Sequence, residues 1–248
     1  FRLHLDGTLD SGFGTGGWVE LGFGGTVRSS IRPSLLFLMS PALALGSGGV
    51  ITFAGRQGRN LLVSRLLPDG SSDDGFAVDG TYTGQDLGLA QNSIVVIPGG
   101  GYRVLTREQL ETGARCRVLA LTPSGAPDAA FGSGGYADLG TPAEVSASCG
   151  DLVELADGRL LVVGTEGDSA FAIRLLANGA VDPTFSSADI AETAHSLEKA
   201  VVDGKGRIVV VGRGAGDVAG AVVSRLLSDG AVDQSFGNRG STWLDLGG

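Results

Sequence analysis

The apolar positions of the chain recur in short runs, and the same order of runs returns along most of its length. Each unit has two apolar runs joined by a glycine-containing turn, which predicts a β-hairpin. The clearest second runs lie at residues 158–164 and 206–212. A third apolar run follows a polar loop, and a more polar fourth run closes the unit. One unit is therefore predicted to be four antiparallel strands.

An Asp-x-x-Phe element follows the third run of every unit and sets the spacing of the array. Its phenylalanines are separated by 63, 55, 54 and 51 residues, and they are Phe13, Phe76, Phe131, Phe185 and Phe236. A period of this size indicates repeated supersecondary units. Four-stranded antiparallel units of this length favour a β-propeller, since the coils of a solenoid are shorter and a sandwich would not repeat its sequence. We predict a single all-β propeller domain over residues 1–248.

The number of blades depends on how the two ends of the chain are used. The third run and its turn occur five times, whereas the preceding hairpin occurs four times. The chain opens on a predicted third strand at residues 1–5 and ends on a predicted fourth strand at residues 241–246. We predict five blades, one of them either incomplete or closed by pairing of the N- and C-terminal strands.

The pattern Asp-Gly-x-x-Asp-x-x-Phe-Gly-x-x-Gly, a strand, and then Asp-Gly-Arg-Leu-Leu-Val-Val-Gly resembles the delta-60 repeat family of bacterial proteins. The resemblance covers essentially the whole chain and is best at residues 157–164, 229–240 and 6–17. It is weakest where Ser124 replaces the turn aspartate and Arg107 replaces the strand-ending glycine. The resemblance implies a propeller-like fold in exported or surface proteins of bacteria. The family has no defined activity, so the resemblance implies no catalytic residue.

Composition and charge argue against several classes of protein and of binding partner. The chain has 43 glycines, yet 42% of its residues are apolar, so it is not a disordered glycine-rich tract. Its net charge of -9 and its lack of a basic stripe argue against binding of nucleic acid or of anionic membranes. No apolar run is long enough to span a bilayer, so we expect no transmembrane segment.

Two charged residue types recur at fixed places in the units. The aspartates are Asp10, Asp73, Asp128, Asp182 and Asp233, and the arginines are Arg2, Arg65, Arg174 and Arg225, with Ala120 breaking the arginine series. Each aspartate is predicted to cap a turn, because Asp accepts backbone N–H bonds well there. The alternative is a ring of calcium ligands. Each arginine is predicted to bond the repeated aspartate or a nearby carbonyl; the alternative is a channel-lining ring that attracts an anion.

Two smaller sets of residues, an acidic loop and a pair of cysteines, each allow more than one interpretation. The loop with Asp69, Asp73 and Asp74 is the only one dense enough in carboxylates to suggest calcium, although six to eight oxygens are usual. Cys116 and Cys149 match no zinc motif. They either form a disulfide between neighbouring units, which would imply an oxidising compartment, or remain two buried thiols.

The repeats and the absence of a catalytic pattern lead to the expected function. We expect a non-catalytic, exported bacterial scaffold that binds another protein or belongs to a larger assembly, without a cofactor. Irregular loops at residues 23–41, 80–92 and 108–115 are the expected partner surface. The alternative is a propeller enzyme, or a protein that binds a carbohydrate or a quinone-type ligand at the channel mouth. The candidates for that site are the non-repeated Arg103, Arg107, Glu108 and Glu111.

Overall fold

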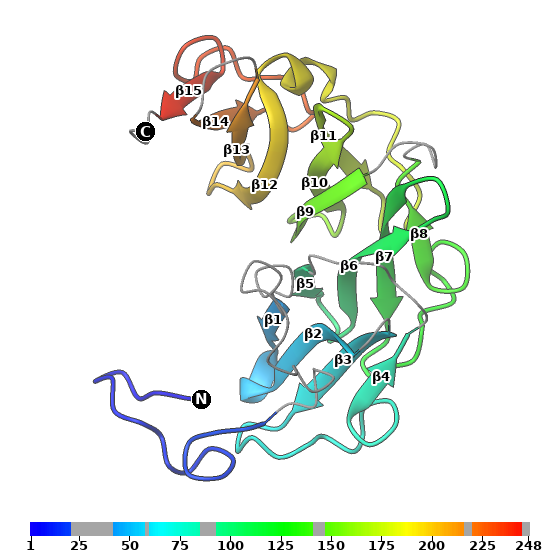
Figure 1. Cartoon of the computed structure of the whole chain (residues 1–248), viewed down its shortest axis with the longest axis vertical. Helices are drawn as coiled ribbons and strands as arrows, with labels where there is room; N and C mark the ends of the chain where they lie inside the picture. Colours follow the sequence, from blue (N-terminus) through cyan, green and yellow to red (C-terminus); the bar gives the residue numbers. More distant parts are fainter. Residues whose placement is uncertain (21–41, 58–59, 85–92, 141–146, 216–219, 245–248) are drawn as a thin grey trace.

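The protein is all-β, and its sheets follow one another along an arc (Figure 1). The computed structural model describes residues 1–20, 42–57, 60–84, 93–140, 147–215 and 220–244. The first and second sheets each have four antiparallel strands. In order they contain β1 (Ala42–Leu45), β2 (Ile51–Gln57), β3 (Asn60–Leu66) and β4 (Thr81–Thr83), then β5 (Ser93–Val96), β6 (Tyr102–Gln109), β7 (Ala114–Leu121) and β8 (Tyr136–Asp138).

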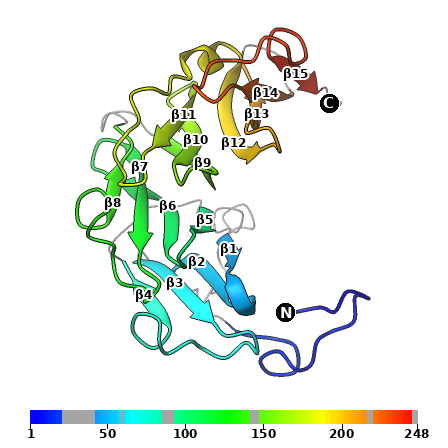
Figure 2. The ribbon, with the colours of Figure 1, turned by 180° about the vertical axis from the view of Figure 1, so that it is seen from behind.

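The third and fourth sheets continue the arc. They contain β9 (Ala147–Glu154), β10 (Leu160–Glu166) and β11 (Ser169–Leu175), then β12 (Ala194–Val202), β13 (Ile208–Gly214), β14 (Ala221–Leu226) and β15 (Ser241–Leu244). Both views place β1, β5, β9 and β12 on the concave side of the arc (Figures 1 and 2). Successive members of this series contact each other. Every sheet is therefore a blade that begins on the inside, as in a propeller.

The apolar run of β10 shows why these strands have no polar face. Leu160 and Val162 pack into a core shared with the second sheet, whereas Leu161 and Val163 pack into a core shared with the fourth. All four side chains are at most 1% exposed. A sheet that is covered on both faces requires apolar residues at both odd and even positions. The uninterrupted apolar run is thus the sequence signature of face-to-face blades.

The predicted fourth strand is missing from the third sheet. There the Ser187 hydroxyl takes over strand pairing, because Oγ accepts from Ala172 N at 3.1 Å and donates to Ala172 O at 2.7 Å. A 3-10 helix, η3 (Ala188–Glu192), then leads into β12. Short η2 (Ser47–Gly49) lies between β1 and β2. The prediction of four strands per unit is therefore wrong for this unit.

The N-terminal unit, residues 1–20, also differs from the prediction. It has isolated bridges, Leu3 to Leu9 and Thr15 to Trp18, instead of a strand over residues 1–5. Within the described part of the chain no hairpin lies beside this segment to extend it into a sheet. The N-terminal unit and β15 lie at opposite ends of the arc (Figures 1 and 2). Closure by N- and C-terminal strands is therefore not shown, and the described sheets number four. No helix in the described ranges is long and apolar enough to cross a membrane.

Candidate functional site

The recurring arginine, aspartate and phenylalanine form one cluster in each unit, which we call a box and name by its phenylalanine. In the Phe185 box, Arg174 Nε donates to Asp182 Oδ2 at 2.8 Å, and the guanidinium carbon lies 4.8 Å from the ring centroid. A cation held between a carboxylate and a ring face is stabilised by both. Equivalent boxes join Arg2, Asp10 and Phe13; Arg65, Asp73 and Phe76; and Arg225, Asp233 and Phe236.

The second carboxylate oxygen of each box caps the following turn. Asp182 Oδ1 accepts from Thr184 N at 2.9 Å and from Thr184 Oγ1 at 2.7 Å. These hydrogen bonds, followed by those from the arginines, hold the pKa of Asp182 far below its usual range. The pKa of Asp10 is also lowered, mainly by the hydrogen bond from Arg2. The repeated aspartate therefore has two structural partners, one in its own turn and one in the strand beside it.

Four of the five boxes, those of Phe13, Phe76, Phe131 and Phe185, also dock on the turn of the next unit. The amide after the phenylalanine donates to a carbonyl of that turn; the pairs are Gly14 to Asp69, Ala77 to Ser124, Gly132 to Asn178 and Ser186 to Asp229, at 2.6–2.9 Å. Arg2, Arg65 and Arg174 donate through Nη1 to the preceding carbonyls, those of Pro68, Pro123 and Ser228. The phenylalanines Phe13, Phe76 and Phe131 are at most 4% exposed and enter the core of the following sheet. The boxes thus link successive sheets.

The glycine of each docking turn, which follows Asp69, Ser124, Asn178 or Asp229, is required by this contact. Gly125 has φ +83, and a Cβ there would lie 2.8 Å from the Phe76 ring and 2.8 Å from Ala77 N. The same approach occurs at Gly70, Gly179 and Gly230. A side chain at these places would both strain the backbone and separate the sheets. The glycine that recurs in these turns therefore forms the receiving half of the joint between successive units.

The Phe131 box has its arginine on a different strand. Ala120 occupies the usual position on β7, and the residue paired with it across the sheet is Arg103 on β6. Arg103 is 6% exposed, its guanidinium carbon lies 4.7 Å from the Phe131 ring, and Nη2 lies 3.4 Å from Asp128 Oδ2. Burial lowers the pKa of Arg103. The sequence analysis placed Arg103 among candidates for an enzyme site; the structure makes it the missing member of a box.

The other candidates for an enzyme site do not converge on one point. Arg107 Nε donates to Ala147 O at 2.6 Å. Glu108 Oε2 accepts from Arg115 Nε at 2.6 Å, and Glu111 is exposed in the β6–β7 turn. His4 and His195 lie in different units, and His195 Nδ1 lies 2.7 Å from Asp168 O. These side chains do not form a nucleophile–base constellation.

The calcium candidates are divided between two turns. Asp69 Oδ1 accepts from Ser71 N and Oγ at 2.9 and 2.7 Å, whereas Asp73 Oδ2 accepts from Arg65 Nε at 2.7 Å. Asp74 is exposed and adjoins Asp73. Within the described ranges, no three Asp, Glu, His or Cys side chains are grouped as a metal site would require. The structure therefore does not bring these three carboxylates together.

Cys116 and Cys149 form a disulfide between β7 and β9. Both residues are at most 1% exposed and lie in the core shared by the second and third sheets. One further contact between sheets had no signal in the sequence. The Tyr82 and Tyr136 hydroxyls lie 3.3 Å apart between the first and second sheets, and burial, with that contact, raises the pKa of Tyr82. Register and the curvature of the arc, which decide such meetings, are not readable from spacing alone.

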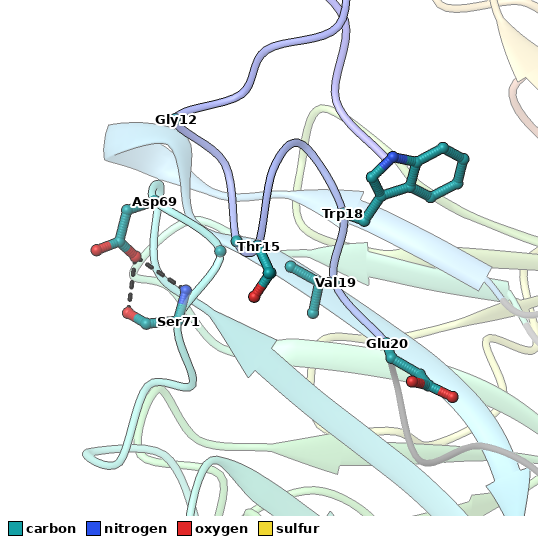
Figure 3. A pocket seen from close by; sticks show the side chains of 9 residues that line it. Gly12, Thr15, Trp18, Val19, Glu20, Asp69 and Ser71 are labelled. Carbon is teal, nitrogen blue, oxygen red and sulfur yellow. Dashed lines mark hydrogen bonds between the residues drawn. The ribbon is translucent and has the colours of Figure 1, made fainter.

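An open groove of about 780 Å³ lies where the N-terminal unit meets the turn at residues 69–71 (Figure 3). Its polar and aromatic lining includes Trp18, Glu20 and Asp69. Trp18 and Asp69 project in opposite directions from the two sides of the groove (Figure 3). The aromatic face and the carboxylate therefore do not converge on one ligand.

The strand pairing separates two edges of the sheets. In the second sheet, Gln109 pairs with Ala114 at one end and Tyr102 with Leu121 at the other. The β6–β7 connection thus lies at the first end, and the docking turn that follows β7 lies at the second. The third sheet is arranged alike, with Glu166 paired with Ser169 at the first end. We call the two ends the loop edge and the docking edge.

Only some of the predicted partner loops lie within the described residues. Residues 108–115 lie at the loop edge, on the β6–β7 connection. Gly84, which follows β4, donates to Leu61 O at the loop edge of the first sheet. Residues 85–92 and 23–41 lie outside the described residues. Residues 108–115 and Gly84 therefore share the loop edge, whereas Gly80, at the other end of β4, accepts from Arg65 N and lies against the turn at Ser72 and Asp73.

Comparison with known proteins supports the propeller repeat. A family model described as "Domain of unknown function (DUF5122) beta-propeller" matches residues 155–185 and 206–236. No curated protein matches the chain. A solved structure of unknown function from Dyadobacter fermentans is 14% identical, with a TM-score of 0.53 over 83% of this chain and 64% of that one.

A catalytically inactive virginiamycin B lyase from Staphylococcus aureus, solved with quinupristin, is 10% identical, with a TM-score of 0.52. The alignment covers 84% of this chain and 56% of the lyase, so the chain spans less than two thirds of either protein. At these identities the likeness concerns the fold alone. The chain is thus similar in fold to propeller proteins and carries two segments of a propeller repeat of unknown function.

Proposed function

We propose that this chain is a non-catalytic, extracytoplasmic bacterial scaffold of the delta-60 repeat type, and that its loop edge binds another protein. The observation that carries the proposal is that the repeated charged side chains are engaged in contacts within and between the units. Every repeated arginine lies against its aspartate and over its phenylalanine, and three of them also bond the next unit. The repeated side chains therefore build the frame, which leaves the irregular loops to carry recognition.

We further propose five blades, of which the N-terminal unit is the incomplete fifth. Its support is the box of Arg2, Asp10 and Phe13, which docks on the first sheet as the Phe76, Phe131 and Phe185 boxes dock on the units that follow them. The extracytoplasmic location is supported by the Cys116–Cys149 disulfide, since disulfides persist in oxidising compartments.

Site-specific photo-crosslinking in the producing bacterium tests the proposed binding edge. A crosslinking residue replaces Glu111, which is exposed at the loop edge, and a matched control replaces Lys205, which is exposed in the β12–β13 turn at the docking edge. We expect a defined protein adduct from position 111 and none from position 205. Equal adducts from both positions, or no protein adduct from position 111, would reject the loop edge as the binding surface.

A further inference from the structure

The docking turn that receives the Phe131 box contains a dipeptide that the other docking turns lack. Asn178 is followed by Gly179, and it is the only asparagine of the sequence that precedes a glycine. An aspartate or a serine takes the place of Asn178 in the other docking turns. We propose that Asn178 is a site of spontaneous deamidation, and that opening of the joint between the Phe131 box and this turn controls the rate.

The reaction needs only water and base, because both reacting groups belong to neighbouring residues. The Gly179 nitrogen loses its proton to base and attacks Asn178 Cγ, and the Cγ–Nδ2 bond breaks with release of ammonia. Water then opens the resulting cyclic imide at either carbonyl, which yields aspartate or isoaspartate without any change in oxidation state. Glycine favours the attack because it has no Cβ to crowd the nitrogen. Asn178 is exposed, so water and hydroxide reach its amide.

Hydrogen bonds engage both reacting groups while the joint is closed. Gly179 N, the attacking nitrogen, donates to Leu176 O at 2.9 Å. Ala180 N donates to Asn178 Oδ1 at 3.1 Å, and Gly132 N donates to Asn178 O at 2.8 Å. Ring closure requires the Asn178 side chain to rotate onto the Gly179 nitrogen, which breaks the bond from Ala180. The turn therefore resists the reaction as long as these bonds persist.

The second sheet packs directly against the backbone of this turn. A Cβ at Gly179 would lie 3.1 Å from Phe131 Cε1 and 3.1 Å from Ala137 Cβ, so these side chains contact the turn. Phe131 is 1% exposed and leaves this place only when the two sheets separate locally. Local openings of this kind cost less free energy than global unfolding. Opening of the joint is therefore the step that permits ring closure.

The products affect the joint differently. An aspartate keeps the cap of the turn, as Asp69 does in the first sheet, where Oδ1 accepts from Ser71 N at 2.9 Å. Isoaspartate routes the main chain through Cγ, so the carbonyl that Gly132 N reaches becomes a free carboxylate. The Cys116–Cys149 disulfide crosses the same junction and keeps the sheets linked. The site lies at the docking edge, so the proposal does not rest on the partner surface at the loop edge.

Peptide mapping by mass spectrometry measures the reaction in the 248-residue chain. After incubation at mildly alkaline pH, trypsin releases residues 175–199, with Asn178 as their only asparagine, and residues 226–239, which contain the control Asn238. A synthetic peptide of residues 175–199 gives the rate without a joint. We expect Asn178 to react at least about tenfold more slowly in the folded chain, as for a joint that is open less than about a tenth of the time. Equal rates, or equal conversion of Asn238, which precedes an arginine, overturn the proposal.

A matched pair of variants separates opening of this joint from general loss of stability. Phe131→Ala disables the joint on the turn of Asn178, whereas Phe76→Ala removes an equally buried phenylalanine from the joint between the first and second sheets. We expect Phe131→Ala to bring the rate toward that of the peptide, and Phe76→Ala to leave it near wild type. Arg103→Ala and Arg65→Ala weaken the same boxes and replace any variant that circular dichroism shows to be unfolded. Equal acceleration at both joints, or none at the Phe131 joint, overturns the proposal.

Discussion

The Phe131 and Phe185 boxes place a guanidinium at the same point from different strands. Arg174 comes from β11 and reaches both Asp182 and Ser228 O of the fourth sheet. Arg103 comes from β6, lies 3.4 Å from Asp128, and donates to Tyr102 O of its own strand. Both side chains are at most 6% exposed. The fold thus requires a buried cation above the ring, and either strand can supply it.

The choice of strand changes the link between sheets. Three of the four internal boxes send an arginine bond to the next turn, and the Phe131 box is the exception among the described residues. The junction it serves, between the second and third sheets, is also the junction crossed by the Cys116–Cys149 disulfide. The comparison suggests that a covalent link takes the place of a hydrogen bond there. Three predictions follow from that difference, the largest effect first.

Removal of the disulfide should give the largest effect. The cysteines are 33 residues apart, and the chain-entropy model assigns a loop of this size about 3–4 kcal/mol. We expect Cys116→Ala with Cys149→Ala to lower the melting temperature by about 10 °C for a chain of this length. Differential scanning calorimetry measures the change, and reductant added to the double variant is the control. A shift below a few degrees would show that this junction does not need the bond.

Moving the arginine back to its usual strand tests the exchange itself. Arg103→Ala leaves Asp128 without its cation and should cost about 1–3 kcal/mol, since Asp128 remains partly exposed. Ala120→Arg in that background should restore most of the loss, and its guanidinium should gain the carbonyl before Asn178. Urea denaturation measures each step. The transplanted variant should also lose less stability than wild type on reduction, and an equal loss would contradict the compensation between bond types.

Protonation of Asp182, the carboxylate of the Phe185 box, should change the stability of the protein by the smallest amount of the three. Because the pKa of Asp182 is lowered in the folded state, its stabilising effect is fully present above the unfolded value of 3.8 and is lost as pH falls below that value toward the folded pKa. Asp182→Asn should be less stable than wild type at neutral pH. The difference in unfolding free energy between the two proteins should become smaller as pH falls below about 4. Thermal unfolding at several pH values measures it. A gap independent of pH would mean that the charge of Asp182 does not matter.

The sequence by itself determined the repeat, its strands and the joint. The alternation of apolar runs and Asp-Gly turns predicts strands that the structure places within a few residues, for example Asn60–Leu66 and Ala221–Leu226. The spacing of the repeated residues predicts that an arginine meets its aspartate. These features are local or recur with the period of the array, so a pattern recognised in one unit predicts the same structure in the others.

Only the tertiary structure decided which strand completes a box, where a unit departs from its neighbours and how the ends are placed. Arg103 replaces the arginine absent at Ala120 because antiparallel register sets the two opposite each other, and register is not visible in a linear pattern. Ser187 replaces a fourth strand because one hydroxyl can both donate to and accept from Ala172. The small rotation from sheet to sheet accumulates along the chain. The ends therefore lie apart although every local joint obeys the sequence.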